Sequence, residues 1–137
     1  MYSTLPVPPV SPATLRAARF VAGVPVLFLI FDTVIKLIRI EPVTMSFVQL
    51  GYAPSLAVGI GLLELACLTL YVVPRTSILG AVLMTGYLGG AVATHVRAGS
   101  PLFTHVLFPV YVGILIWLGV FLADHRVRAL LPVRMHA

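Results

Sequence analysis

The chain has 137 residues, of which 60% are hydrophobic and only 9% are charged, and its formal net charge is +5. An ordinary soluble domain has about 25% charged residues, so this chain could not cover a globule with a water-compatible surface. A nucleic-acid partner is not indicated either, because the nine Lys and Arg residues stand mostly at the edges of apolar segments and form no basic run interleaved with aromatic residues. The composition predicts a single domain in contact with the lipid bilayer.

A proline-rich segment begins the chain. Residues 1–12 include four prolines and no basic residue, which predicts an extended, mobile tail over residues 1–13 rather than a signal peptide. Four apolar segments follow, over approximately residues 15–39, 54–73, 76–96 and 103–123. Each is near the ~20 residues that cross a bilayer as a helix. We expect a four-helix transmembrane domain over residues 14–131 and a C-terminal tail over residues 132–137.

The connections between these segments predict how the helices are arranged. Pro74 and Arg75 are almost all that separates the second segment from the third, so these two segments form a tight antiparallel hairpin. Residues 97–101, RAGSP, make another short turn, and residues 40–53 are expected to form a turn and a short interfacial helix with Tyr52 as an anchor. The predicted fold class is all-α, a transmembrane four-helix bundle with a short interfacial segment between helices 1 and 2.

Glycines indicate the helix faces that are expected to touch. Gly86 and Gly90 lie four residues apart in TGYLGGAVATH, a spacing that lets helix backbones approach closely. Gly59 and Gly61 are expected to do the same in the second helix.

The basic residues predict the orientation in the membrane. Four spans place both termini on one side, and that side carries Arg16, Arg19, Arg75, Arg126, Arg128 and Arg134. The other side carries Lys36, Arg39 and Arg97. This asymmetry favours both termini in the cytoplasm.

Five ionisable residues lie within or at the mouth of the predicted spans: Asp32, Lys36, Glu64, His95 and His105. The four-residue spacing of Asp32 and Lys36 places them on one helix face, within reach of an ion pair. At ~1.5 Å of rise per residue, Glu64 lies near the midplane, and Asp32 and His95 lie from there towards the non-cytoplasmic side. A charge facing lipid costs at least ~2.5–3.5 kcal/mol, so Glu64 is expected to face the bundle interior. In the bundle interior, Glu64 is either neutral, or charged and paired with Lys36 or with a protonated His95.

These residues come from three helices at neighbouring depths, so a shared pocket is expected. Asp32, Glu64 and His95 are the candidate catalytic residues, and Lys36, Tyr87 and Tyr111 are candidates for binding a substrate. Simpler interpretations stay open: Asp32 and Lys36 form a pair that only neutralises itself, Glu64 is a hydrogen-bonding hub that clamps helices, and His95 is an interfacial residue. No short spaced motif supports a metal site, and none is expected.

Three stretches carry a resemblance to a known family: FLIFDTVIKLI, the run from LGYAPS through TSILGAVLMTGYLGGAVATH to RAGSP, and LFPVYVGILIWLGVFLADHRVRALLP. Together they cover nearly everything after the proline-rich tail, and they resemble the DoxX-like family of small four-helix membrane proteins. The resemblance implies a left-handed four-helix bundle in the inner membrane with Asp32, Lys36, Glu64 and His95 in its interior. Members of the wider family look like subunits of membrane redox systems, including thiosulfate:quinone oxidoreductase. Related branches carry paired cysteines, which this sequence lacks, since Cys67 is its only cysteine.

Three hypotheses about function are left open. The first is an intramembrane pocket for a small apolar or lipid-like molecule, with acid–base catalysis of isomerisation, cyclisation or epoxide opening and no cofactor. Glu64 would be the acid or base, Asp32 its complement, and His95 a proton shuttle near the mouth. The second is a subunit of a membrane redox complex, in which His95 would donate a hydrogen bond to a quinone. The third is a non-enzymatic assembly partner or chaperone that forms a homo-oligomer or joins a membrane complex.

Overall fold

The computed structural model describes residues 9–130, which form helices joined by short connections. The elements are α1 (Pro12–Leu37), α2 (Glu41–Gln49), α3 (Leu56–Val72), α4 (Ser77–Arg97), a π-helix (Leu102–Val106), α5 (Phe108–Ala123) and α6 (His125–Leu130). No strand occurs between residues 9 and 130, so the prediction of an all-α protein is confirmed. Most of the two predicted tails, residues 1–8 and 132–137, lies outside the described part of the chain.

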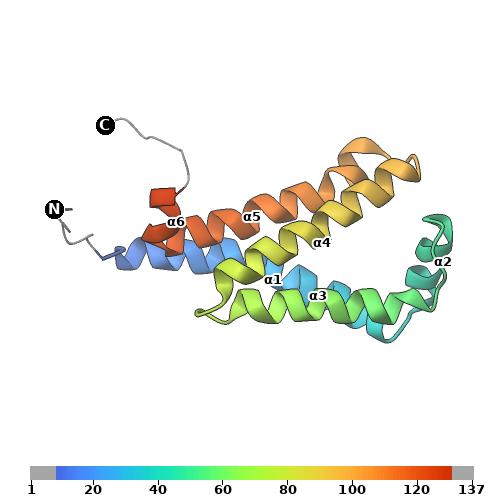
Figure 1. The fold of residues 1–137 in the computed structure, drawn as a ribbon, viewed down its shortest axis with the longest axis horizontal. Coiled ribbons are helices and arrows are strands. Elements are labelled where there is room, and N and C mark those ends of the chain that lie inside the picture. The colour runs from blue at the N-terminus through green and yellow to red at the C-terminus, as the bar shows by residue number, and fades with distance from the viewer. Residues whose placement is uncertain (1–8, 131–137) are drawn as a thin grey trace.

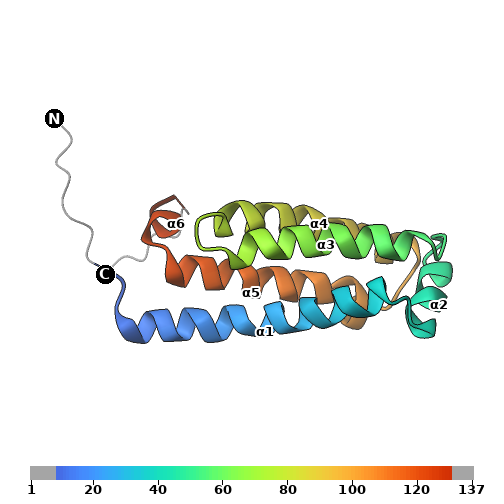
Figure 2. The same ribbon diagram turned by 90° about the horizontal axis from the view of Figure 1, so that it is seen from below.

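The four longest helices, α1, α3, α4 and α5, lie side by side (Figures 1 and 2). α1 packs against α3 and α5, and α4 packs against the same two helices. The start of α1, the α3–α4 connection and α6 lie at one end of the molecule, and α2 lies across the other end (Figure 1). Arg16, Arg19, Arg75, Arg126 and Arg128 thus belong to the first end, and Lys36, Arg39 and Arg97 lie towards the other; Arg134 is outside the described residues.

Local sequence signals set the helix ends. The Ser11 side chain accepts a hydrogen bond from the Thr14 amide at 3.2 Å, and Pro12 occupies the first helical position, so α1 begins three residues before the expected residue 15. The predicted hairpin is observed, because α3 ends at Val72, just before Pro74, and α4 begins at Ser77. The predicted helix within residues 40–53 is α2.

The fourth predicted segment is not one regular helix. It is divided into the π-helix and α5, and α6 follows as a short helix that the sequence analysis did not predict. Pro109 has no amide hydrogen, so it cannot continue an α-helical ladder back to His105. Before it, the Val106 and Leu107 amides bond five residues back, to Pro101 O at 3.2 Å and to Leu102 O at 2.9 Å, which is the π-helical pattern. α6 begins where Asp124 Oδ1 accepts a hydrogen bond from the Arg126 amide at 2.8 Å.

The outer surface of the helices is largely apolar. Large side chains such as Phe20, Leu27 and Phe103 are exposed. Three helical segments, Pro12–Leu37, Ser77–Arg97 and Leu102–Ala123, are long and apolar enough to cross a membrane, whereas α3 is a shorter apolar helix of 17 residues. The protein is therefore a membrane protein in contact with the lipid bilayer.

The closest helix contacts at glycines occur at Gly80 and Gly119, which the sequence did not predict. A Cβ added at Gly80 would overlap the backbone of Tyr71, and a Cβ at Gly119 would lie 2.9 Å from the Cβ of Ala22. Gly61 makes the expected contact, since a Cβ added at this position would lie 3.1 Å from the Cβ of Lys36.

For Gly86, Gly90 and Gly59 the prediction of close contact within the chain is wrong, because a Cβ at each would meet nothing within 4 Å. The physical reason for two of them is that Gly86 and Gly90 line a cavity.

α2 is held against the end of α4 by polar contacts. Arg97 Nη2 donates to the Leu50 carbonyl at 2.5 Å, and its guanidinium lies 5.6 Å from the ring centroid of Tyr52. The Tyr52 hydroxyl is hydrogen-bonded to Thr94 Oγ1 at 2.9 Å. Gly51 has a φ of 77°, a conformation that favours glycine, and so allows the chain to turn from α2 towards α3.

Candidate functional site

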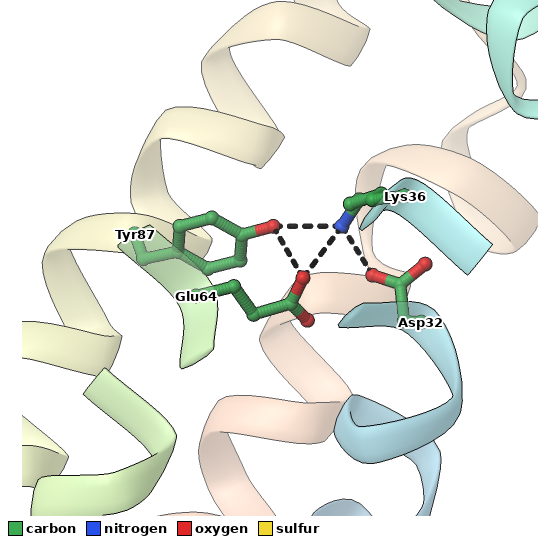
Figure 3. A network of polar contacts seen from close by, with 4 residues as sticks. All are labelled: Asp32, Lys36, Glu64 and Tyr87. Atoms are coloured by element: carbon green, nitrogen blue, oxygen red, sulfur yellow. Dashed lines mark hydrogen bonds and ion pairs between the residues drawn. The ribbon is translucent and has the colours of Figure 1, made fainter. Parts of the chain in front are cut away.

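Four side chains from three helices form one hydrogen-bonded cluster (Figure 3). Lys36 Nζ donates to Asp32 Oδ2, to Glu64 Oε2 at 2.8 Å and to the Tyr87 hydroxyl at 2.8 Å. The Tyr87 hydroxyl in turn donates to Glu64 Oε2 at 3.1 Å. Asp32 and Lys36 come from α1, Glu64 from α3 and Tyr87 from α4. We call these four residues the polar cluster.

Each helix presents its member of the polar cluster for a local reason. Asp32 and Lys36 are one turn apart on the last part of α1, so both point the same way. Gly61 lets the backbone of α3 approach Lys36, and Glu64 follows Gly61 by three residues on the same side of α3. Tyr87 lies near the middle of α4 and reaches across to α3. The cluster therefore joins three helices at the depth at which α1 ends.

The polar cluster is shielded from solvent to different degrees. The side chain of Glu64 is 0% exposed, that of Lys36 is 12% exposed and that of Asp32 is 27% exposed. Glu64 Oε1 is buried and has no hydrogen-bond partner among residues 9–130. Two carboxylates face one ammonium, so the fully ionised cluster carries one net negative charge, and one added proton makes it neutral. Burial of a net charge is costly, so the cluster is suited to taking up a proton or a cation.

A cavity of about 870 Å³ opens beside the polar cluster. Such a volume is at the upper end of the ~300–1,000 Å³ of most small-molecule sites. Its walls come from α1, α2, α3, α4 and α5 and are mostly apolar, with side chains such as Phe28, Ile35, Phe47, Leu88 and Val112. Asp32, Lys36 and Tyr87 form one polar part of the wall, and Tyr52, Thr94 and His95 form another nearer to α2. Glu64 does not line the cavity but is hydrogen-bonded to Lys36 and Tyr87, which do.

The structure brings together four of the six predicted site residues. Asp32, Lys36, Glu64 and Tyr87 are the polar cluster, and the interpretation of Asp32 and Lys36 as a self-contained pair does not hold, because Lys36 also binds Glu64. Tyr111 is 44% exposed and does not line the cavity.

His95 lines the cavity but makes no hydrogen bond to the polar cluster. Its Nδ1 is hydrogen-bonded to Ser100 Oγ at 3.0 Å, and its ring packs edge-on against that of His105, with centroids 5.6 Å apart. His105 is exposed and its Nδ1 is hydrogen-bonded to Thr104 Oγ1 at 2.8 Å. His95 therefore shares the cavity wall with Asp32, and the alternative in which a protonated His95 pairs with Glu64 is not observed. Between residues 9 and 130, no group of three or more His, Cys, Asp or Glu side chains could hold a metal ion.

The family model of the DoxX-like family matches residues 20–119, which include all four members of the polar cluster. The chain belongs to the DoxX-like family. No curated protein and no solved structure matches it.

In this DoxX-like protein, apolar residues that the sequence did not single out shape the site. Phe28 precedes Asp32 by one turn of α1 and lines the cavity, and its ring packs edge-on against that of Phe108, with centroids 5.0 Å apart. Phe47 of α2 also lines the cavity. The four-residue spacing of Phe28 and Asp32 was visible in the sequence, but aromatic residues are common in apolar segments, so nothing distinguished Phe28 from its neighbours.

Proposed function

We propose that this DoxX-like protein binds a small lipophilic molecule in the cavity and that the polar cluster acts on the polar part of that molecule as an acid and a base. The observation that carries the proposal is the placement of Asp32, Lys36 and Tyr87 on the wall of an otherwise apolar cavity of about 870 Å³. A stable bundle does not need such a cavity, and apolar pockets with a few convergent polar groups are the usual form of small-molecule sites. An intramembrane carboxylate is costly, and such residues usually mark functional sites.

The proposal includes a transmembrane arrangement in which all four long helices cross the bilayer. The 17 residues of α3 span about 26 Å at ~1.5 Å per residue, somewhat less than the ~30 Å of a hydrocarbon core. α3 packs against α1 and α4, which are both longer, and forms a hairpin with α4, so it crosses with them (Figure 2). An even number of spans and the Arg-rich end that contains α6 favour cytoplasmic termini in an inner membrane.

The polar cluster supplies the two protonation states that acid–base catalysis needs. With one proton on its two carboxylates, it has one acid and one base in a neutral assembly. Asp32 is the member that touches the bound molecule. Glu64 does not reach the cavity, and it gains or loses its proton through the hydrogen bonds to Lys36 and Tyr87. In an isomerisation, the acid donates a proton to one carbon and leaves the substrate positive and the cluster negative. The base then removes a proton from another carbon, which restores both charges with no cofactor.

A second candidate is the binding of a quinone as part of a membrane redox complex. The observation in its favour is that His95 lines the same cavity while Ser100 occupies its Nδ1, so its Nε2 is left for a quinone carbonyl. In this case the quinone would be the redox cofactor, and the polar cluster would exchange the protons that accompany its reduction.

Filling the cavity tests the proposal. Gly90 lines the cavity and Gly89 does not, and a Cβ at either would meet nothing within 4 Å. The parent protein, Gly90→Phe and Gly89→Phe would each be purified. Mass spectrometry would then identify the lipophilic molecules extracted from each protein. We expect at least one molecule to be present with the parent and Gly89→Phe and absent with Gly90→Phe. If the molecule with this pattern is a quinone, the second candidate is favoured. Identical extracts from all three proteins would overturn both candidates.

A further inference from the structure

We infer that the molecule bound in the cavity is a lipophilic amine, held in its protonated form at Asp32. The inference rests on the proposed function and names the class of its ligand. It follows from the hydrogen-bonding capacity that the polar cluster leaves unused, from its charge and from the aromatic residue beside it.

In the fully ionised polar cluster, every donor is already used. The three N–H groups of Lys36 point to Asp32, Glu64 and Tyr87, and the single O–H of Tyr87 points to Glu64. A ligand that only accepts hydrogen bonds, such as a carboxylate or a ketone, would have to break one of these bonds. The cluster therefore offers the cavity no donor without a loss.

The unused group on the cavity side is an acceptor. Asp32 Oδ1 takes no hydrogen bond from any residue in the described part of the chain, and Figure 3 shows it turned away from Lys36. Asp32 lines the cavity and its side chain is the most exposed of the three charged groups, at 27%. The ligand group that fits this position is a hydrogen-bond donor.

Charge selects an ammonium over a neutral donor. Asp32, Lys36 and Glu64 together carry one net negative charge when ionised, and a protonated amine at Asp32 cancels it. A protonated amine that binds the fully ionised cluster brings its own proton, so the net charge of the site changes from −1 to zero and no covalent bond of the cluster breaks. A hydroxyl group would donate to Asp32 Oδ1 but would leave the charge balance of the cluster as it was.

An aromatic side chain beside Asp32 favours a cation further. Phe28 is one turn before Asp32 on α1, and both line the cavity. Its ring is supported by an edge-on contact with Phe108. Cations bind favourably over aromatic rings, and a neutral alcohol gains nothing comparable. The remaining apolar wall suits a long hydrocarbon body.

Three probes with the same chain and different head groups test the assignment: dodecylamine, dodecanol and dodecanoate. Saturable binding would be measured by equilibrium dialysis with the full-length protein in phosphatidylcholine nanodiscs, and partition into empty nanodiscs would be subtracted. A hydrogen bond to a charged group contributes about 1.5–3 kcal/mol, which corresponds to roughly tenfold or more in affinity. We expect dodecylamine to bind at least about tenfold more tightly than dodecanol, and dodecanoate to bind most weakly.

Variants connect this preference to the site. Asp32→Asn should weaken dodecylamine binding by about 10–100-fold while dodecanol binding stays within about threefold, which also shows that the variant is folded. Phe28→Leu should weaken dodecylamine alone by about 2–5-fold. Asp124→Asn, a matched carboxylate change at the start of α6, should alter neither.

Equal affinities of the three probes, tighter binding of dodecanoate, or an unchanged amine affinity in Asp32→Asn would each overturn the amine assignment. Saturable binding of dodecanol alone, abolished by Gly90→Phe, would overturn it as well and would leave the proposed function standing. No saturable binding of any probe would overturn the assignment, and the extraction experiment with Gly90→Phe and Gly89→Phe would decide the proposed function independently.

Discussion

Replacement of Lys36 by methionine is the perturbation that should reveal how the polar cluster is held together. The methionine side chain is similar in length and apolar, so it fills the space but donates no hydrogen bond. Its introduction leaves Asp32, Glu64 and Tyr87 without the ammonium that joins them. Glu64, which is 0% exposed, would be the most affected, because water cannot replace the lost partner.

The size of the effect follows from burial. Removal of one partner from a buried ion pair typically costs 3–5 kcal/mol, because the other charge stays buried and unpaired. Proton uptake by a carboxylate offsets part of this cost, so we expect Lys36→Met to lower the free energy of unfolding by about 3 kcal/mol. Glu64→Gln in the Lys36→Met background removes the unpaired carboxylate and should recover roughly half of the loss.

The measurement is unfolding of the purified protein by titration with sodium dodecyl sulfate in mixed micelles, followed by circular dichroism. Arg19→Met is the matched control, since Arg19 is an exposed basic residue of the same helix, and its effect should stay within about 0.5 kcal/mol. The reasoning would be refuted if Lys36→Met were as stable as the parent protein, or if the double variant were no more stable than Lys36→Met.

Two further predictions concern the packing of the helices and use the same titration. Gly80→Ala should destabilise the protein by about 3 kcal/mol or more, because the new methyl group would overlap the backbone of Tyr71. Gly86→Ala is the control and should be neutral or stabilising by up to about 1 kcal/mol, since a Cβ there meets nothing within 4 Å. Equal stabilities of the two variants would contradict the observed helix contact at Gly80. Tyr71→Phe should cost about 0.5–1.5 kcal/mol, since it removes the buried hydrogen bond to the Ile116 carbonyl at 3.1 Å, and no loss would show that this bond contributes nothing.

Apolar segment length and proline placement were sufficient to predict most of the fold. The apolar segments gave the approximate positions of α1, α3, α4 and α5, and Pro74 gave the α3–α4 hairpin. The π-helix and α6 were missed because each depends on a few hydrogen bonds near one residue, Pro109 or Asp124, which leave little trace in hydropathy.

The candidate site was predictable in part. Asp32, Lys36 and Glu64 stood out because ionisable residues are rare in apolar segments, and their spacing placed two of them on one face. Tyr87 joined them and Tyr111 did not, although the two tyrosines looked alike in the sequence. The difference lies in the rotation of α4 and α5 about their axes, which is set by packing against neighbouring helices rather than by composition.

By itself, the sequence determined that the protein is helical, that it lies in a membrane and which charged residues must be shielded from lipid. These properties follow from composition and from local chain geometry, because a charge in a hydrocarbon environment is costly wherever the helix is placed. Only the tertiary structure decided that Lys36 binds two carboxylates at once, that Gly86 and Gly90 border a cavity rather than a helix contact, and that Asp32 lines this cavity while Glu64 does not. Each of these depends on distances between helices far apart in the chain, and helical periodicity carries no information about such distances.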